Sequence, residues 1–219
     1  MTWESKHIRF FLTLPKLGRA RVRKIIETNP DVYSWDKNAV INQLGLESLT
    51  DSLPEQIPEL ADLDSSEVIN FTERNFPENL KMMRKDGPLL LWYRGNLNIE
   101  KSLAVVGSRN MIEETSYIVE SFVRKASDRD YSIISGLALG VDTKAHVCAL
   151  ENNAKTVAIL PSSLDNILPS SNRELAGEIV EHGGLLLSEY EPGTDDNPPN
   201  RNYLMRNRLQ AGMSDAVFI

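Results

Sequence analysis

Short apolar runs alternate with longer stretches that carry a polar face, from about residue 89 to the end of the chain. The apolar runs predict strands at 89–93, 103–106, 131–134, 156–160, 185–188 and 216–219. The stretches between them predict helices at 113–129, 141–151, 172–182 and 202–211. Near-continuous apolar runs are typical of strands that helices cover on both faces. The pattern therefore predicts an α/β fold with a Rossmann-like, doubly wound and mostly parallel sheet.

The first part of the chain has a different pattern, in which small helical stretches lead to a loop rich in proline and acidic residues. Helices are predicted there at about 8–14, 19–27 and 36–44. The sequence thus predicts a small all-α domain at 1–64, followed by the α/β domain at 65–219. Ser65, Ser66 and Glu67 look like the start of a further helix that reaches Glu73, because they combine a capping residue with an acidic first turn.

The segment LPKLG, residues 14–18, connects the first two predicted helices. It is similar to the hairpin of a helix-hairpin-helix motif, whose backbone N–H groups hold a nucleic-acid phosphate. Lys16 stands where that motif prefers its first glycine, and Gly18 keeps the second. The alternative is a plain connector between two helices.

Two predicted strands end at turns of small residues, Gly107-Ser108 and Ser135-Gly136. A glycine at the carboxyl end of such a strand lets the backbone approach a ligand closely. The helix N-termini that follow present free N–H groups, which attract anions. The sequence therefore predicts a phosphate-binding edge of the sheet. Because the first turn reads G-S-R-N-M-I rather than G-x-G-x-x-G, we expect no dinucleotide cofactor.

A formal net charge of −7 argues against a generic nucleic-acid binder, so any basic site has to be local. Arg109 follows the first small-residue turn, where a guanidinium can hold a phosphate or pair with a carboxylate that closes the sheet edge. Arg206 and Arg208 lie on the last predicted helix, and Arg173 begins the helix before it. We predict that these four arginines form a basic cluster; a solvated helix face is the alternative for the last helix.

Few residues suggest catalysis or metal binding. Asp142 and His146 share one face of a predicted helix, where they could form a catalytic pair or fix a loop. The second role is favoured because no nucleophile accompanies them: Asp142 would cap the helix and His146 would bond to the backbone. His7 and His182 are isolated in the sequence, so no metal site is predicted.

Cys148 is the single cysteine of the chain and permits no intramolecular disulfide, which suits a reducing cytoplasm. Its place among alanines on a predicted helix indicates a buried, unreactive thiol. No apolar run approaches the ~20 residues that span a bilayer, so no membrane association is expected.

Six blocks between residues 76 and 219 together resemble the DNA-processing protein A family (DprA, also called Smf) of bacterial transformation. The first three are FPENLKMMRKDGPLLLWYRG, LAVVGSRN and SGLALGVDTKAH. The others are TVAILPSSLDNILPSSNREL, LLLSEYEPG and RNRLQAGMS. They occur in the order in which that family has its motifs.

The resemblance implies an extended Rossmann fold after an N-terminal SAM-like domain. It also implies a homodimeric protein that binds single-stranded DNA without catalysis, protects incoming DNA during natural transformation (competence), and loads the RecA recombinase for DNA recombination. Carried over by position, the DNA pocket consists of Gly107, Ser108, Arg109, Ser135, Gly136, Arg206, Asn207 and Arg208.

Some positions depart from the family pattern. Pro161 and Ser163 replace two glycines, which stiffens that turn, Leu168 stands for the usual tyrosine, and Leu204 replaces a proline. The last predicted strand ends at Ile219, where the family continues. We therefore expect that the chain is cut short, that it is mainly monomeric, and that it recruits RecA poorly.

Two other functions fit the pattern less well. One is a Rossmann-like nucleoside-phosphate hydrolase of the lysine-decarboxylase-like kind, which shares a phosphate site at the strand edge. Such enzymes carry a PGG-x-GT-x-x-E motif, and this sequence has no PGG. The other is a structural remnant that binds no DNA.

Overall fold

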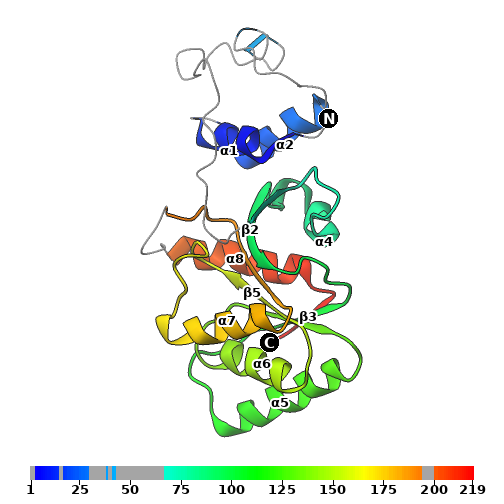
Figure 1. The fold of residues 1–219 in the computed structure, drawn as a ribbon, viewed down its shortest axis with the longest axis vertical. Coiled ribbons are helices and arrows are strands. Elements are labelled where there is room, and N and C mark those ends of the chain that lie inside the picture. The colour runs from blue at the N-terminus through cyan, green and yellow to red at the C-terminus, as the bar shows by residue number, and fades with distance from the viewer. Residues whose placement is uncertain (1–2, 15–16, 30–37, 39–40, 43–66, 194–199) are drawn as a thin grey trace.

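The computed structural model describes residues 3–14, 17–29, 38, 41–42, 67–193 and 200–219. Within them, seven strands form one sheet in the order β1-β2-β6-β5-β4-β3-β7 (Figure 1). The strands are β1 (Glu67–Asn70), β2 (Leu90–Gly95), β3 (Ser102–Val105), β4 (Ser132–Ser135), β5 (Thr156–Leu160), β6 (Leu185–Ser188) and β7 (Ala216–Phe218). The α-helices are α1 (Ser5–Thr13), α2 (Arg19–Thr28), α4 (Glu78–Met82), α5 (Glu113–Ser127), α6 (Val141–Glu151), α7 (Arg173–Glu181) and α8 (Asn200–Met213).

Five neighbouring strands of this sheet, β7, β3, β4, β5 and β6, run parallel. Ala104 of β3 lies opposite Ile134 of β4 on one side and Val217 of β7 on the other. At the other edge β2 runs antiparallel to β6, with Trp92 opposite Ser188, and β1 runs antiparallel to β2. The predicted α/β fold with a mostly parallel sheet is thus confirmed.

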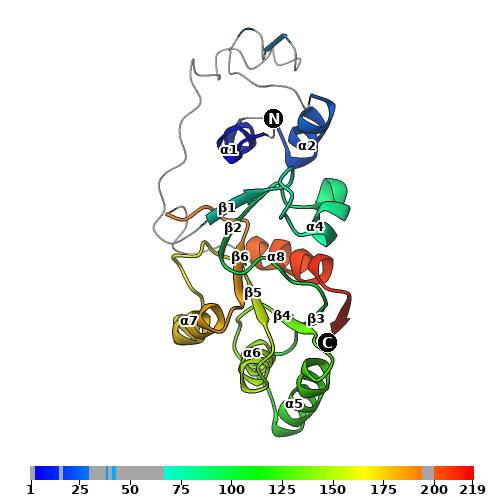
Figure 2. The same ribbon diagram turned by 45° about the vertical axis from the view of Figure 1, so that its right-hand side comes forward.

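Helices cover both faces of the parallel strands, as Figure 2 shows: α8 lies on one side, and α6 and α7 lie on the other. The helix α6 contacts β3, β4 and β5, whereas α8 contacts β3 and β5 from the opposite face. Every residue of β4 and of β5 is buried. This double cover explains why β5 is almost entirely apolar in the sequence and why the two central residues of β4, Ile133 and Ile134, are apolar.

The predicted helix from Ser65 to Glu73 is wrong: the described part of that segment is the strand β1, followed by a tight turn. Val68 lies opposite Trp92 in the ladder with β2. The turn is fixed by Asn70, whose Oδ1 accepts hydrogen bonds from the backbone N–H and the hydroxyl of Thr72. An asparagine that holds the backbone two residues on favours a turn over a continuing helix.

The helices α1 and α2 confirm the predicted N-terminal helical region; α1 packs against β1 and β2, and α2 packs against α1 and the 3-10 helix η2 (Arg84–Asp86). Phe11 and Val22 of these helices belong to the same cluster of buried side chains as Leu91 and Leu186 of the sheet. Gly18 is the N-cap residue of α2. Lys16, most of the predicted helix at 36–44, and the predicted domain boundary at 64 and 65 lie outside the described residues.

Candidate nucleic-acid interface

The loops that follow β3 and β4 meet at the carboxyl edge of the sheet, where the sequence predicts a phosphate site. The backbone N–H of Val141, at the start of α6, donates a hydrogen bond to the carbonyl of Ser108 at 3.1 Å. Gly140 permits this approach, because its φ is +77° and an added Cβ would collide with the Ser108 oxygen. The loop after β3 (with Gly107, Ser108 and Arg109), the loop after β4 (with Gly136) and the first turn of α6 therefore form one structure. We call it the edge site.

The second small-residue turn makes room for a buried arginine. Nη1 of Arg206, on α8, donates hydrogen bonds to the carbonyl oxygens of Gly136 and Ile159, both at 2.7 Å. A Cβ on Gly136 would collide with this guanidinium. The glycine predicted to admit a ligand thus admits the protein's own arginine. Arg206, predicted to contact DNA, is only 5% exposed, and its N–H groups bind the ends of two strands.

Asp142 compensates the buried charge of Arg206. Its Oδ2 accepts a hydrogen bond from the backbone N–H of Gly136 at 3.0 Å. Burial raises the pKa of this carboxyl, while the Arg206 charge and the backbone donors act in the opposite direction. The predicted capping role is wrong, because Gly140 occupies the N-cap position of α6 and Asp142 instead ties the β4 turn to that helix.

His146 is fully buried one turn further along α6. Its Nδ1 lies 2.7 Å from the hydroxyl oxygen of Thr156, rather than bonding to the backbone as predicted. The Thr156 hydroxyl gives its one hydrogen to the carbonyl of Ile133, so Nδ1 is the donor and Nε2 has no proton. Burial, and secondarily the Arg206 charge, lower the pKa of His146 to about 3.

Arg109 is the exposed cation of the edge site. Its guanidinium lies over the ring of Tyr203, on α8, with 5.3 Å between the guanidinium carbon and the ring centroid. These two side chains separate two cavities, because both line a cavity of about 460 Å³ and also one of about 270 Å³. Stacking on the ring leaves the N–H groups of Arg109 at the rim free to donate to an anion.

Both cavities have a mostly apolar lining. Gly107, Asp142 and Asn207 contribute to the wall of the larger one. The smaller cavity is lined by Gly136 and by apolar residues, among them Pro161 and Leu168. These two are departures from the family pattern, and here they supply an apolar surface beside Arg109. An apolar cavity with a cation at its rim suits a ligand that has both a flat apolar part and an anionic part.

The other predicted site residues lie outside both cavities. Ser135 is buried and its hydroxyl donates to the carbonyl of Val105 at 2.6 Å, which joins β4 to β3. The Ser108 hydroxyl donates to the carbonyl of Asn110 and thereby closes its own turn. Arg173 is exposed at the start of α7, and Arg208 points away from the edge site. Residue-by-residue assignment of DNA contacts therefore stays a prediction.

The described residues include no group of three or more histidine, cysteine, aspartate or glutamate side chains that could hold a metal ion. Cys148 is buried, and burial raises the pKa of its thiol. None of the described helices is both long and apolar enough to cross a bilayer.

Comparison with known proteins decides the family. The family model of DNA recombination-mediator protein A matches residues 67–219, which is well over half of the chain. The chain belongs to this family. The resemblance predicted from the six sequence blocks is thereby confirmed.

Two curated proteins match most of this chain at similar identity. Protein Smf of Borreliella burgdorferi is 36% identical over 148 residues, which are 67% of this chain and 46% of that protein. DNA processing protein DprA of Streptococcus pneumoniae is 38% identical over 136 residues, which are 61% of this chain and 47% of that protein. The chain thus spans about half the length of the curated relatives that it matches.

Two solved structures of family members have the same fold. The X-ray structure of DNA processing protein A from Streptococcus pneumoniae superposes with a TM-score of 0.80 at 27% identity, and covers 99% of this chain and 77% of that one. DNA processing protein A from Helicobacter pylori, a structure concerned with its single-stranded DNA binding mode, gives a TM-score of 0.60 at 32% identity. That match covers 69% of this chain and 67% of the Helicobacter chain.

Proposed function

We propose that the chain binds single-stranded DNA at the edge site, with Arg109 on a backbone phosphate and Tyr203 against a nucleobase. The observation that carries the proposal is the pair formed by these residues between two cavities. Proteins that bind single strands without sequence preference combine cationic side chains with aromatic faces on which bases stack. Membership of the mediator family and the likeness to the Helicobacter protein support the same ligand.

The strand would bind through few phosphates. Of the predicted arginines, only Arg109 is both exposed and part of a cavity wall, whereas Arg206 is buried. Each phosphate contact on a single strand contributes about −0.7 to the slope of log affinity against log salt. One or two contacts therefore give a slope of roughly −0.7 to −1.4 for a short strand.

The test is a fluorescence anisotropy titration with labelled oligo-dT at low salt. Arg109→Ala should weaken binding by about tenfold to a hundredfold, the range for a lost hydrogen bond to a charged group. Tyr203→Ala should weaken it by a similar factor, whereas Tyr203→Phe keeps the stacking surface and should bind nearly as the unchanged chain does. Arg124→Ala, an exposed residue on α5, is the control for the change in net charge. Equal affinities of Arg109→Ala and Arg124→Ala would contradict the proposal.

We further propose that DNA binding serves recombination: the chain protects incoming single strands in the cytoplasm and delivers them weakly to RecA, with the chain mainly monomeric, in contrast to the homodimer that the family resemblance implies. The chemistry is proposed to be non-catalytic. The hydrogen bond of Asp142 supports the fold, and His146 has no exposed atom with which to act as a base. RecA filament growth on oligo-dT, with and without the chain, tests delivery; absence of stimulation would contradict it.

A further inference from the structure

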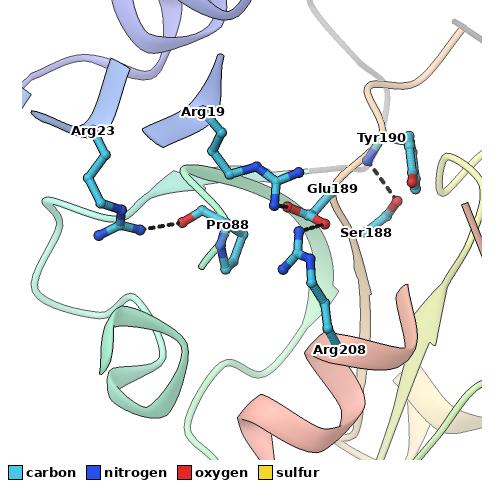
Figure 3. Close-up of polar contacts among 7 residues, drawn as sticks. All are labelled: Arg19, Arg23, Pro88, Ser188, Glu189, Tyr190 and Arg208. Carbon is cyan, nitrogen blue, oxygen red and sulfur yellow. Dashed lines mark hydrogen bonds and ion pairs between the residues drawn. The ribbon is translucent and has the colours of Figure 1, made fainter. Parts of the chain in front are cut away.

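Two arginines that are far apart in the sequence meet at one carboxylate (Figure 3). Glu189 follows β6, and its Oε2 accepts a hydrogen bond from Nη2 of Arg208 on α8. Nη1 of Arg19, on α2, lies 3.5 Å from Oε1 of the same carboxylate. We call these three residues the junction, because they join the N-terminal helices to the sheet and to the helix that carries Tyr203.

Positive charge exceeds negative charge at the junction. Burial lowers the pKa of Arg19, and Glu189 opposes this, but the charges of Arg208 and Arg201 lower that pKa further. Nε and Nη1 of Arg208 are buried and have no hydrogen-bond partner among the described residues. Buried hydrogen-bond donors without partners lower the stability of the folded protein. Two guanidinium groups that share one carboxylate can still donate to a further anion.

The helix α2 does not depend on Glu189 for its position. Nη2 of Arg23 donates to the carbonyl of Pro88 at 3.0 Å, so that α2 is anchored one turn further on (Figure 3). The backbone around Glu189 is also fixed, because the N–H of Tyr190 donates to the hydroxyl of Ser188 at 3.0 Å. The Glu189 side chain can therefore change partners while both of its neighbours stay in place.

A cavity of about 320 Å³ lies beside the junction. Its wall includes Arg19, Glu189 and the aromatic residues Trp92 and Tyr190, together with Arg9, which pairs with Glu191 of the same wall at 2.8 Å. Cations and aromatic rings in one wall are the combination that suits a nucleotide unit of a single strand. Arg208 of the junction follows Asn207, which lines the larger cavity of the edge site. The helix α8 therefore connects the junction to the edge site.

We propose that the junction is a second phosphate subsite for single-stranded DNA, in which a backbone phosphate displaces the Glu189 carboxylate from Arg19 and Arg208. The inference rests on the proposed function, because it extends the strand held at the edge site. Glu189 is then a competing counter-ion: it offsets part of the charge of the two arginines in the free protein and lowers the affinity for long strands.

The test compares oligo-dT of roughly 5 and roughly 20 nucleotides, lengths near and above the smallest site sizes of single-strand binders. Glu189→Gln removes the competing charge, and should raise the affinity for the long strand about twofold to fivefold, the effect of one screened ion pair. Its affinity for the short strand should stay unchanged. Arg19→Gln should lower the long-strand affinity by a similar factor and make its salt slope shallower by about 0.7.

Glu120→Gln is the matched control, because it makes the same change in net charge by breaking the ion pair with Lys144 on α6. If Glu189→Gln and Glu120→Gln bind the long strand equally, and Arg19→Gln binds it as the unchanged chain does, the subsite is wrong while edge-site binding stands. If the unchanged chain binds neither strand at low salt, both the subsite and the proposed function are wrong. Thermal unfolding of each variant verifies that the compared proteins are folded.

Discussion

The edge site and the junction both place arginines near one carboxylate, but the partners differ in kind. At the edge site Arg206 donates to main-chain carbonyls, and Asp142 accepts from a main-chain N–H. At the junction the Glu189 carboxylate pairs with the side chains of Arg19 and Arg208. An arginine held by main-chain oxygens can leave only if the strands move. An arginine held by a carboxylate can exchange that partner for another anion.

This difference predicts that the edge site contributes strongly to stability. Arg206→Ala removes the hydrogen bonds to Gly136 and Ile159 and leaves the Asp142 carboxylate without an opposite charge. Removing one partner of a buried charge pair costs about 3–5 kcal/mol in the free energy of unfolding. Urea titration measures the loss, with Arg109→Ala as control, which should change stability by no more than about 0.5 kcal/mol. Similar losses in both variants would show that Arg206 does not hold the strand ends together.

The second prediction tests why the β4 turn has a glycine. Gly136→Ala places a Cβ against the Arg206 guanidinium, and overpacking of this kind costs about 1–3 kcal/mol. Gly177 on α7 is the matched control, because no atom lies within 4 Å of an added Cβ. There the same substitution should stabilise the protein by about 0.5–1 kcal/mol, through helix propensity. If both variants have the same midpoint in urea, the close approach at Gly136 does not constrain the fold.

Much of the fold could be predicted from the sequence, because burial on both sides of a sheet leaves a local signature. The strand β5 and the helix α6 have the predicted limits for this reason. The strand β1 was missed, since four residues carry little periodicity and its pairing with β2 depends on residues far along the chain. The Ser-Ser-Glu start resembles a helix cap, and the local signal against a helix is limited to Asn70, which favours a turn.

The site was less predictable than the fold. Arg109 could be found because it follows a strand that ends in small residues. Tyr203 was missed, although it lies one helical turn before Arg206, because a helix as polar as α8 does not show which face is covered. Each step along an α-helix turns the side-chain direction by about 100°, so Arg206 and Arg208, two steps apart, point to nearly opposite sides of the helix. Only the packing shows that the first enters the protein and the second reaches Glu189.

The third prediction concerns the pH dependence of stability, which we expect to come from His146, a buried residue near Arg206 of the edge site. The pKa of His146 is about 3 in the folded protein, against an ordinary value of 6.5, so the unfolded chain takes up the proton first. The stability that comes from neutral His146 is complete above the ordinary pKa and is lost as pH falls towards 3. The loss approaches about 1.4 kcal/mol per pH unit, or about 2 kcal/mol by pH 5.

Asp142 works in the opposite direction, because its raised pKa favours proton uptake by the folded protein. Unfolding in urea at pH 7 and pH 5, compared between the unchanged chain and His146→Gln, isolates the histidine contribution. The variant should lose less stability between these two values. An unchanged pH dependence would mean that the buried imidazole does not govern acid sensitivity.

The smallest predicted effect on stability belongs to the junction. Arg19→Gln removes one of the two cations at Glu189, but Arg208 keeps its hydrogen bond to that carboxylate and Arg23 still anchors α2. Arg19 is partly exposed, and ion pairs of this kind contribute no more than about 1 kcal/mol. The variant should therefore unfold in urea almost as the unchanged chain does, while it binds the long oligonucleotide more weakly. A loss of stability as large as that of Arg206→Ala would mean that Arg19 is held as firmly as Arg206 is at the edge site. The Glu189 carboxylate would then not be a partner that Arg19 can exchange for a phosphate.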